Sequence, residues 1–321
     1  MVKAVLSMIV KDSVERVGED VFLKVLEASL QVPYYSVILV DDSSSEKTAE
    51  AVRRFAEENG KELVATRSRL PQGWSHPTRA TARQTALDTF FENFSEEWLM
   101  FLDDDCVLNQ GWWKWVEENK ALEDERVGEV WGINWDADIS KKRYIEALGR
   151  DYGDYLVEAF ERRGGTHDTL LRRKAVEGVR IPPELHVLED AWLHHYVRCR
   201  GYRYVVNPVG VTHLHPPEPL TFSREKQQIK QALKVALKYG IVAESYSVPR
   251  SRLGAWLSLV RPVVGLAPTV WVHLRVYGAQ GVPIAVKKQL VKLMWRYYVA
   301  RSLRGDLPDV CEAIKNYHAE L

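Results

Sequence analysis

The amino-acid sequence predicts an α/β protein with a Rossmann-like, doubly wound and mainly parallel sheet, followed by a basic, mainly helical C-terminal region. Short apolar runs alternate with segments of helical periodicity along the first third of the chain, which is typical of a parallel sheet covered by helices. Acidic clusters follow two of these runs. With 321 residues, 46% of them hydrophobic, the chain can bury one large core or two smaller ones.

The first elements follow from these runs. Ala4–Val10 and Ser36–Val40 are rich in β-branched residues, and each ends at a polar cluster, so they predict two strands with a helix between them. Apolar residues recur at helical spacing over Thr48–Asn59, with Ser45 as the expected N-cap and Gly60 as the stop signal. The order of elements up to this point is therefore strand, helix, strand, helix.

Two further strands are expected. Glu62–Thr66 predicts a third strand, Thr78–Phe94 a helix opened by Pro77, and Trp98–Leu102 a fourth strand made of large apolar side chains. Strands separated by helices of this length pair in parallel, and such sheets bind ligands beyond the carboxyl ends of their strands.

Both acidic clusters fall at that edge. Asp41 and Asp42 follow the second strand, and Asp103, Asp104 and Asp105 follow the fourth. Because strand side chains alternate between faces, Asp103 and Asp105 are expected to point the same way and to bind a divalent cation such as Mg²⁺ or Mn²⁺. A solvated turn with an N-cap is the alternative, but clusters at two strand ends favour the ligand site.

Four segments in a fixed order resemble one family. They are VILVDDSSSEKT, ARQTALD, FLDDDC and LEDAWLHHYVRCRGYR. Together they resemble the GT-A glycosyltransferases of the family 2 type over about residues 3–240. The resemblance implies a metal-dependent, inverting, hexosyltransferase-type enzyme that moves a sugar from a UDP- or GDP-sugar to a hydroxyl or phosphate acceptor.

The resemblance also implies residue roles. Nucleotide-sugar binding falls to Asp41, Asp42, Arg83, Asp103 and Asp104. The DxD metal site, for Mn²⁺ or Mg²⁺, falls to Asp103 and Asp105, with His213 completing it. The chain departs from the family pattern at Gln84, where the family has Asn, and at Val10-Lys11-Asp12-Ser13, where the family has a Pro-Thr-Tyr-Asn type of turn.

The middle of the chain is expected to supply the acceptor side. Glu189 and Asp190 open a helix that ends at Gly201, a position that also suits acidic residues through the helix dipole alone. The resemblance implies that Asp190 is the general base, and that Gly164 and Gly165, together with Glu189, form a loop at the donor sugar or the acceptor. A plain loop before a strand would explain the glycines equally well.

A pair of histidines lies further along the chain. His213 and His215 would share one face of a strand, and two prolines follow His215; a histidine beside prolines is more often structural. His213 fits the family phrase better than His215. Zinc is disfavoured, because hard oxygen ligands lie nearby and no thiolate has the right spacing.

The C-terminal region is basic. The formal net charge is zero, yet residues 245–305 contain no Asp or Glu and ten Lys or Arg. Cations mixed with Trp, Tyr and aliphatic residues predict peripheral contact with a membrane surface, and hence a glycan or lipid-linked acceptor. A packed helical subdomain or a dimer interface would give the same composition, whereas nucleic-acid binding is disfavoured.

The sequence predicts a catalytic domain over residues 1–240, divided at 106/107 into nucleotide-binding and acceptor halves, and a helical region over 241–321. We expect neither a signal peptide nor a transmembrane span, since the N-terminal run meets charge early and no apolar run in the tail is long enough. Three widely spaced cysteines argue against a disulfide framework. These features predict a cytoplasmic protein, peripheral on the cytoplasmic membrane face.

Two other functions fit parts of the pattern. A nucleotidyltransferase also places carboxylates and metal on a doubly wound sheet, but it usually has a glycine-rich basic loop after the first strand. A non-catalytic sugar-nucleotide or glycan-binding protein could keep the fold. The presence of Asp103, Asp105 and Asp190 favours the transferase.

Overall fold

The computed structural model describes residues 4–136, 139–214, 222–242, 252–303 and 306–320. The chain divides into two compact units. The catalytic unit, residues 1–137 and 164–216, contains the eight-stranded sheet with the order β3-β2-β1-β4-β7-β6-β8-β5. The helical unit consists of residues 138–163 and 217–321.

One half of the sheet is parallel. Strand β1 (Ala4–Val10) pairs in parallel with β2 (Tyr34–Asp41) and with β4 (Trp98–Leu102), and β2 pairs in parallel with β3 (Glu62–Thr66). Every residue of β4 is buried, as expected for a central strand covered on both faces. Since these strands run the same way, Asp41 and the residues after Leu102 emerge at one edge of the sheet.

The other half of the sheet is mixed. Strand β7 (Asp168–Arg172) is antiparallel to both β4 and β6 (Val127–Asp136). Strand β8 (Arg203–His213) is parallel to β6 and antiparallel to the short β5 (Cys106–Leu108). In the register of β5 against β8, Cys106 lies opposite His213. The end of β8 therefore lies beside the residues that follow β4.

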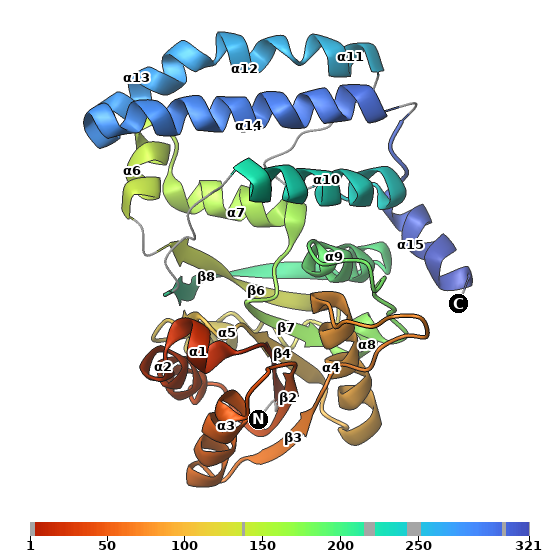
Figure 1. Cartoon of the computed structure of the whole chain (residues 1–321). Coiled ribbons are helices and arrows are strands. Elements are labelled where there is room, and N and C mark those ends of the chain that lie inside the picture. The colour runs from red at the N-terminus through yellow and green to blue at the C-terminus, as the bar shows by residue number, and fades with distance from the viewer. Residues whose placement is uncertain (1–3, 137–138, 215–221, 243–251, 304–305, 321) are drawn as a thin grey trace. The chain divides into compact units, whose positions relative to one another are not determined.

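The helices of the catalytic unit alternate with these strands (Figure 1). They are α1 (Ser13–Val17), α2 (Glu19–Ser29), α3 (Lys47–Glu58), α4 (Arg79–Asn93), α5 (Trp112–Glu118), α8 (Arg173–Val176) and α9 (Glu189–Cys199). The predicted bounds of α3 and α4 are confirmed to within one residue at each end. The expected N-cap at Ser45 is wrong, because Glu46 holds that position without a side-chain hydrogen bond.

The helical unit is described separately. It contains α6 (Ile139–Ala147), α7 (Tyr152–Arg163), α10 (Phe222–Tyr239), α11 (Arg252–Leu257), α12 (Val260–Val264), α13 (Leu266–Tyr277), α14 (Gly281–Ser302) and α15 (Val310–Ala319). Within this unit α11, α12 and α13 run in a row along α14, drawn in blue in Figure 1. Ile229 and Leu233 of α10 form a buried cluster with Trp295 and Val299 of α14.

The compact units differ from the predicted domain limits in two places. Helices α6 and α7 belong to the helical unit although they lie between β6 and β7 in the chain, and α10 belongs to it as well. The predicted end of the catalytic domain at residue 240 therefore lies inside the helical unit, and the functional limits of the catalytic domain stay a prediction. Among the described residues no single helix is long and apolar enough to cross a membrane, although one bent pair, residues 253–264 with 266–302, meets that criterion by length and composition.

Of the three cysteines, Cys106 is a buried free thiol. The sequence-based expectation that the chain has no disulfide framework stays a prediction for the other two.

Candidate active site

The three carboxylates that follow β4 lie in a turn between β4 and β5. β4 ends at Leu102, so the alternation of strand side chains does not extend to Asp103 and Asp105. The prediction that these two share a strand face is wrong for this reason. Each carboxylate of the turn instead meets a different set of partners.

Asp104 anchors the first helix to the sheet. Both of its oxygens lie 2.6 Å from Nη2 of Arg16, and the Ser13 hydroxyl donates to the same carboxylate. Burial raises the pKa of Asp104, while the hydrogen bond and charge of Arg16 oppose the rise. Asp104 was predicted to bind the nucleotide sugar, and the structure gives it an internal salt bridge that spans 88 residues of sequence.

Arg83 of α4 links the acidic turn to helix α9. It is only 3% exposed, its Nη2 lies 3.2 Å from Oδ1 of Asp103, and its Nε donates to Oε1 of Glu189 at 3.4 Å. Burial lowers its pKa, but the neighbouring carboxylates, Asp103 first among them, outweigh burial and raise the pKa above its ordinary value. A single buried cation therefore holds carboxylates from two separate elements.

Glu189 and Asp190 occupy the first turn of α9, as predicted. The residue before them, Leu188, has φ 68° and ψ 18°, a left-handed conformation that is strained for leucine. Glu189 is buried, and burial raises its pKa, with Asp190 adding to the rise and Arg83 opposing it. Asp190 is half-buried and accepts the N–H of Ala191 at 2.8 Å. The turn thus directs one carboxylate toward Arg83 and leaves the other partly accessible.

Asp105, Cys106 and His213 form the one group of three potential metal ligands found in the described part of the chain, with donor atoms within 4.8 Å of one another. Nε2 of His213 lies 3.2 Å from Oδ2 of Asp105. Burial raises the pKa of Asp105, but the hydrogen bond and charge of His213 outweigh it and bring that pKa to about 2.

The chemistry of this group fits a hard or borderline divalent cation. An ionised carboxylate and an imidazole are suitable ligands for Mn²⁺. Burial raises the pKa of the Cys106 thiol well above its ordinary value, and a protonated thiol is a poor ligand. Asp105 and His213 therefore fit the metal, whereas Cys106 does not.

The predicted metal ligands thus lie in two places. Asp105 and His213 are brought together, while Asp103, whose side chain is 36% exposed, pairs with Arg83. His215 lies outside the described residues.

Asp41 and Asp42 lie where the first loops of the sheet meet. Oδ1 of Asp41 accepts the N–H of Ser43 at 2.8 Å, and burial raises the pKa of Asp41. Asp42 accepts the N–H of Ser68 at 3.0 Å and its hydroxyl at 2.5 Å. The N–H of Asp12 donates to Oγ of Ser43 at 2.7 Å. The loops that follow β1, β2 and β3 are therefore tied together at one edge of the sheet.

The glycine loop is buried beside α9. Gly164 has φ 71°, and a Cβ at this position would lie 2.5 Å from Cβ of His194. The Thr169 hydroxyl donates to the carbonyl of Gly165 at 2.6 Å. These contacts give the glycines a packing role, and their place at the donor sugar or the acceptor stays a prediction.

Sequence reasoning missed two buried polar clusters. Nδ1 of His194 lies 2.7 Å from Oε2 of Glu129, and His194 sits one helical turn after Asp190. Asp168 is fully buried and accepts Nε1–H of Trp112 at 2.8 Å. Neither cluster has a local sequence signal, because the paired residues lie 65 and 56 positions apart.

A sheet whose parallel strands end in carboxylate-bearing loops defines an α/β protein of the class that binds ligands, nucleotides above all, beyond the carboxyl ends of its strands. The family model described as glycosyl transferase family 2 matches residues 15–177, and the chain belongs to this family. The resemblance noted in the sequence is thereby confirmed, and the chain is a glycosyltransferase rather than a nucleotidyltransferase.

A solved structure of low sequence identity has the same fold. The mannosyltransferase PcManGT from Pyrobaculum calidifontis, in complex with GDP-Man and Mn²⁺, is 16% identical; the match covers 99% of this chain and 79% of that one, with a TM-score of 0.50. This similarity confirms the predicted GT-A fold.

Two weaker matches carry no further argument. Glucosyl-3-phosphoglycerate synthase from Mycobacterium tuberculosis, in complex with Mn²⁺, UDP and phosphoglyceric acid, is 14% identical over 71% of this chain and 78% of that one, with a TM-score of 0.44. TarS from S. aureus is 12% identical over 95% of this chain and 55% of that one, with a TM-score of 0.49. A search of curated proteins finds no match.

Proposed function

We propose that the chain transfers a sugar, with inversion and with the help of a divalent cation, from a UDP- or GDP-sugar to a hydroxyl or phosphate acceptor. One observation supports this proposal above the others. Buried Arg83 joins the acidic turn at Asp103 to the helix start at Glu189, so the residues expected on the donor side are fixed next to those expected on the acceptor side. Such preorganisation is what a transferase requires to align two substrates.

Asp190 is the general base of this proposal. Inverting transfer needs a carboxylate that takes the proton of the attacking hydroxyl on the face opposite the leaving diphosphate. Asp190 is half-buried in the first turn of α9, next to the strained Leu188. Glu189 pairs with Arg83 and is only 3% exposed, so of the two adjacent carboxylates Asp190 is the more accessible one.

Asp105 and His213 would hold the cation, Mn²⁺ or Mg²⁺, with Asp103 at the same turn. When bound, the cation neutralises the negative charge of the diphosphate group. The mannosyltransferase structure from Pyrobaculum calidifontis contains Mn²⁺ with GDP-Man, which supports a metal and a nucleotide sugar for this chain too. Asp41 and Asp42 would contact the nucleotide base and ribose, because they lie at the meeting point of the first loops.

The helical unit would contact a membrane surface and so favour a glycan or lipid-linked acceptor on the cytoplasmic face. Large apolar side chains on α11 to α14 are unusually exposed, among them Val264 at 70%, Leu253 at 70% and Trp271 at 54%. Residues 245–305 contain cations but no acidic residue. The structure describes this segment except for residues 245–251 and 304–305. Exposed apolar and aromatic residues with cations describe an interfacial surface.

A thermal-shift panel of UDP- and GDP-sugars, with and without Mn²⁺, tests the donor site. A ligand that binds only the folded protein raises the melting temperature by mass action. We expect a Mn²⁺-dependent rise with one nucleotide class only. The absence of a rise with every nucleotide sugar would contradict the proposal.

Asp190→Asn tests the base. Removal of a general base should lower donor hydrolysis and transfer by roughly 10²- to 10⁴-fold, while the donor-induced rise in melting temperature remains. Asp20→Asn is the matched control, since Asp20 is an exposed carboxylate in the first turn of α2. Equal activity loss in both variants, or none in Asp190→Asn, would reject Asp190 as the base.

A further inference from the structure

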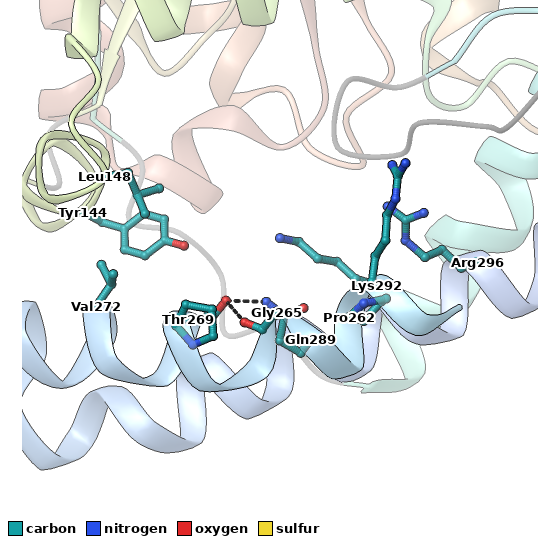
Figure 2. A pocket seen from close by; sticks show the side chains of 11 residues that line it. Tyr144, Leu148, Pro262, Gly265, Thr269, Val272, Gln289, Lys292 and Arg296 are labelled. Atoms are coloured by element: carbon teal, nitrogen blue, oxygen red, sulfur yellow. Dashed lines mark hydrogen bonds between the residues drawn. The ribbon is translucent and has the colours of Figure 1, made fainter. Parts of the chain in front are cut away.

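The helical unit contains a pocket that belongs to no part of the site described above. It has a volume of about 350 Å³ and lies between α6, α12, α13 and α14. Tyr144 and Leu148 close one side, and Thr269 and Gln289 line the floor. Figure 2 shows Lys292 and Tyr144 reaching toward one another across the pocket, with Arg296 beyond Lys292.

Three cations line this pocket: Arg261, Lys292 and Arg296. No Asp or Glu is among the residues that line it, and the sequence has none from 245 to 305. Burial lowers the pKa of Lys292, and the charge of Arg296 lowers it further. Burial likewise lowers the pKa of Arg296, with Arg261 adding to the effect. The three positive charges therefore repel one another at a site that is partly withdrawn from water.

Arg296, which lines the pocket, also carries a buried donor. Its Nη1 is shielded from solvent and makes no hydrogen bond among the described residues. Because this nitrogen is shielded, the rest of the guanidinium group and its charge are what the pocket can offer to a ligand. The repulsion among the three cations would be relieved by an anion with several acceptor oxygens.

The polar floor is already ordered. The Thr269 hydroxyl donates to the carbonyl of Gly265 at 2.6 Å and accepts Nε2–H of Gln289 at 2.6 Å, as the dashed lines in Figure 2 show. Tyr144 is half-buried at the opposite wall and adds a hydroxyl group to the lining. The pocket therefore combines fixed polar groups with three cations, which is the composition that phosphate oxygens require.

We infer that this pocket binds a phosphate group. Arginine matches the geometry of phosphate oxygens with paired N–H donors, and lysine adds a mobile point charge. The group belongs either to a phospholipid headgroup at the membrane surface or to a free phosphate compound. The inference goes beyond the proposed sugar transfer and does not depend on it, since the binding needs neither Asp190 nor a nucleotide sugar.

The test measures binding to the whole chain in a chelating buffer, so that a metal-dependent donor site does not contribute. The probes are inorganic phosphate, vesicles of phosphatidylcholine with phosphatidic acid, and vesicles of phosphatidylcholine alone. Arg296→Gln and Lys292→Gln should each weaken phosphate binding roughly tenfold, because each removes a charge-assisted contact. Lys292 is exposed, so its substitution keeps the test valid even where Arg296→Gln lowers stability.

Arg301→Gln is the matched control, because Arg301 is an exposed cation on α14 that does not line the pocket. A pocket-specific loss with phosphatidic acid vesicles alone supports a lipid source, and the same loss with inorganic phosphate supports a free one. Equal weakening by Arg301→Gln and the pocket variants would overturn the inference, and so would the failure of the unsubstituted chain to bind either phosphate probe. Donor binding, measured separately with nucleotide sugar and Mn²⁺, is unaffected in either case.

Discussion

The catalytic unit and the helical unit differ in how their clustered charges are compensated. In the catalytic unit Arg83 is held between Asp103 and Glu189, and Arg16 between the carboxylates that follow Asp103. In the helical unit the pocket cations lie beside one another without an acid among the residues that line the pocket. In a charge network that is complete within the chain, removal of one partner leaves the other charges buried and unpaired. An incomplete network is instead expected to gain stability from an outside anion.

The strongest test of this difference is Arg83→Met. The substitution leaves Glu189 buried without its cation, so it should lower the free energy of unfolding by about 3–5 kcal/mol. Urea denaturation of the metal-free protein measures the change. Arg53→Met, an exposed change on α3, should alter stability by less than about 0.5 kcal/mol. A loss below about 1 kcal/mol for Arg83→Met would show that the network is not a stabilising one.

His195 is a counterexample within the catalytic unit, because burial and two neighbouring basic residues all act on the pKa of its imidazole in the same direction. Burial lowers its pKa from 6.5 to about 4, with His194 and Arg198 adding to the effect. The stability that it contributes is therefore complete above pH 6.5 and is lost as the pH falls toward 4, by up to roughly 3 kcal/mol.

Urea denaturation from pH 7 to pH 4 checks this expectation. His195→Gln should flatten the loss over that range, whereas His76→Gln, at an exposed position, should leave the profile unchanged. If His195→Gln and the unsubstituted protein lose the same stability, other groups dominate the acid response.

Lys292→Met should change stability in the direction opposite to Arg83→Met. Removal of Arg83 is expected to destabilise the protein, but removal of Lys292 should stabilise the ligand-free chain, because it relieves the repulsion from Arg296. The gain should stay below about 1 kcal/mol, since Lys292 is exposed and water screens its charge. The melting temperature in phosphate-free buffer gives the answer, and a clear decrease would mean that Lys292 already has an anionic partner.

The smallest effect is expected at the surface. Lys114 and Glu118 form an i,i+4 pair at 3.6 Å, with side chains 75% and 63% exposed. Lys114→Gln should change the free energy of unfolding by at most about 0.5 kcal/mol, and salt should reduce even that. A larger change would mean that the exposure of a charged side chain in the catalytic unit does not predict how much its ion pair contributes to the free energy of unfolding.

Local sequence patterns predicted the elements better than the site. Runs such as 4–10, 62–66 and 98–102 became strands with these bounds, because periodicity and β-branched content act over a few residues. The same reasoning failed at Asp103 and Asp105, since it extended strand alternation past Leu102 into a turn.

Most other contacts of the site could not be predicted because they join residues far apart in the sequence. The contacts of Asp104 with Arg16 and of Glu129 with His194 join residues 88 and 65 positions apart, and no local pattern reports them. The contact of His213 with Asp105 is a long-range contact that was predicted. The prediction came from the family resemblance, because the spacing of the two residues along the chain does not indicate it.

The helical unit is interrupted in sequence by the last strands of the sheet. Helices α6 and α7 leave the ribosome before β7, β8 and α13, and His273 of α13 follows Tyr144 of α6 by 129 residues. At about 5–20 residues per second this interval lasts roughly 6–26 s, and the ring contact between Tyr144 and His273 cannot form before it ends. The sheet can therefore be completed before α6 gains its contact with α13.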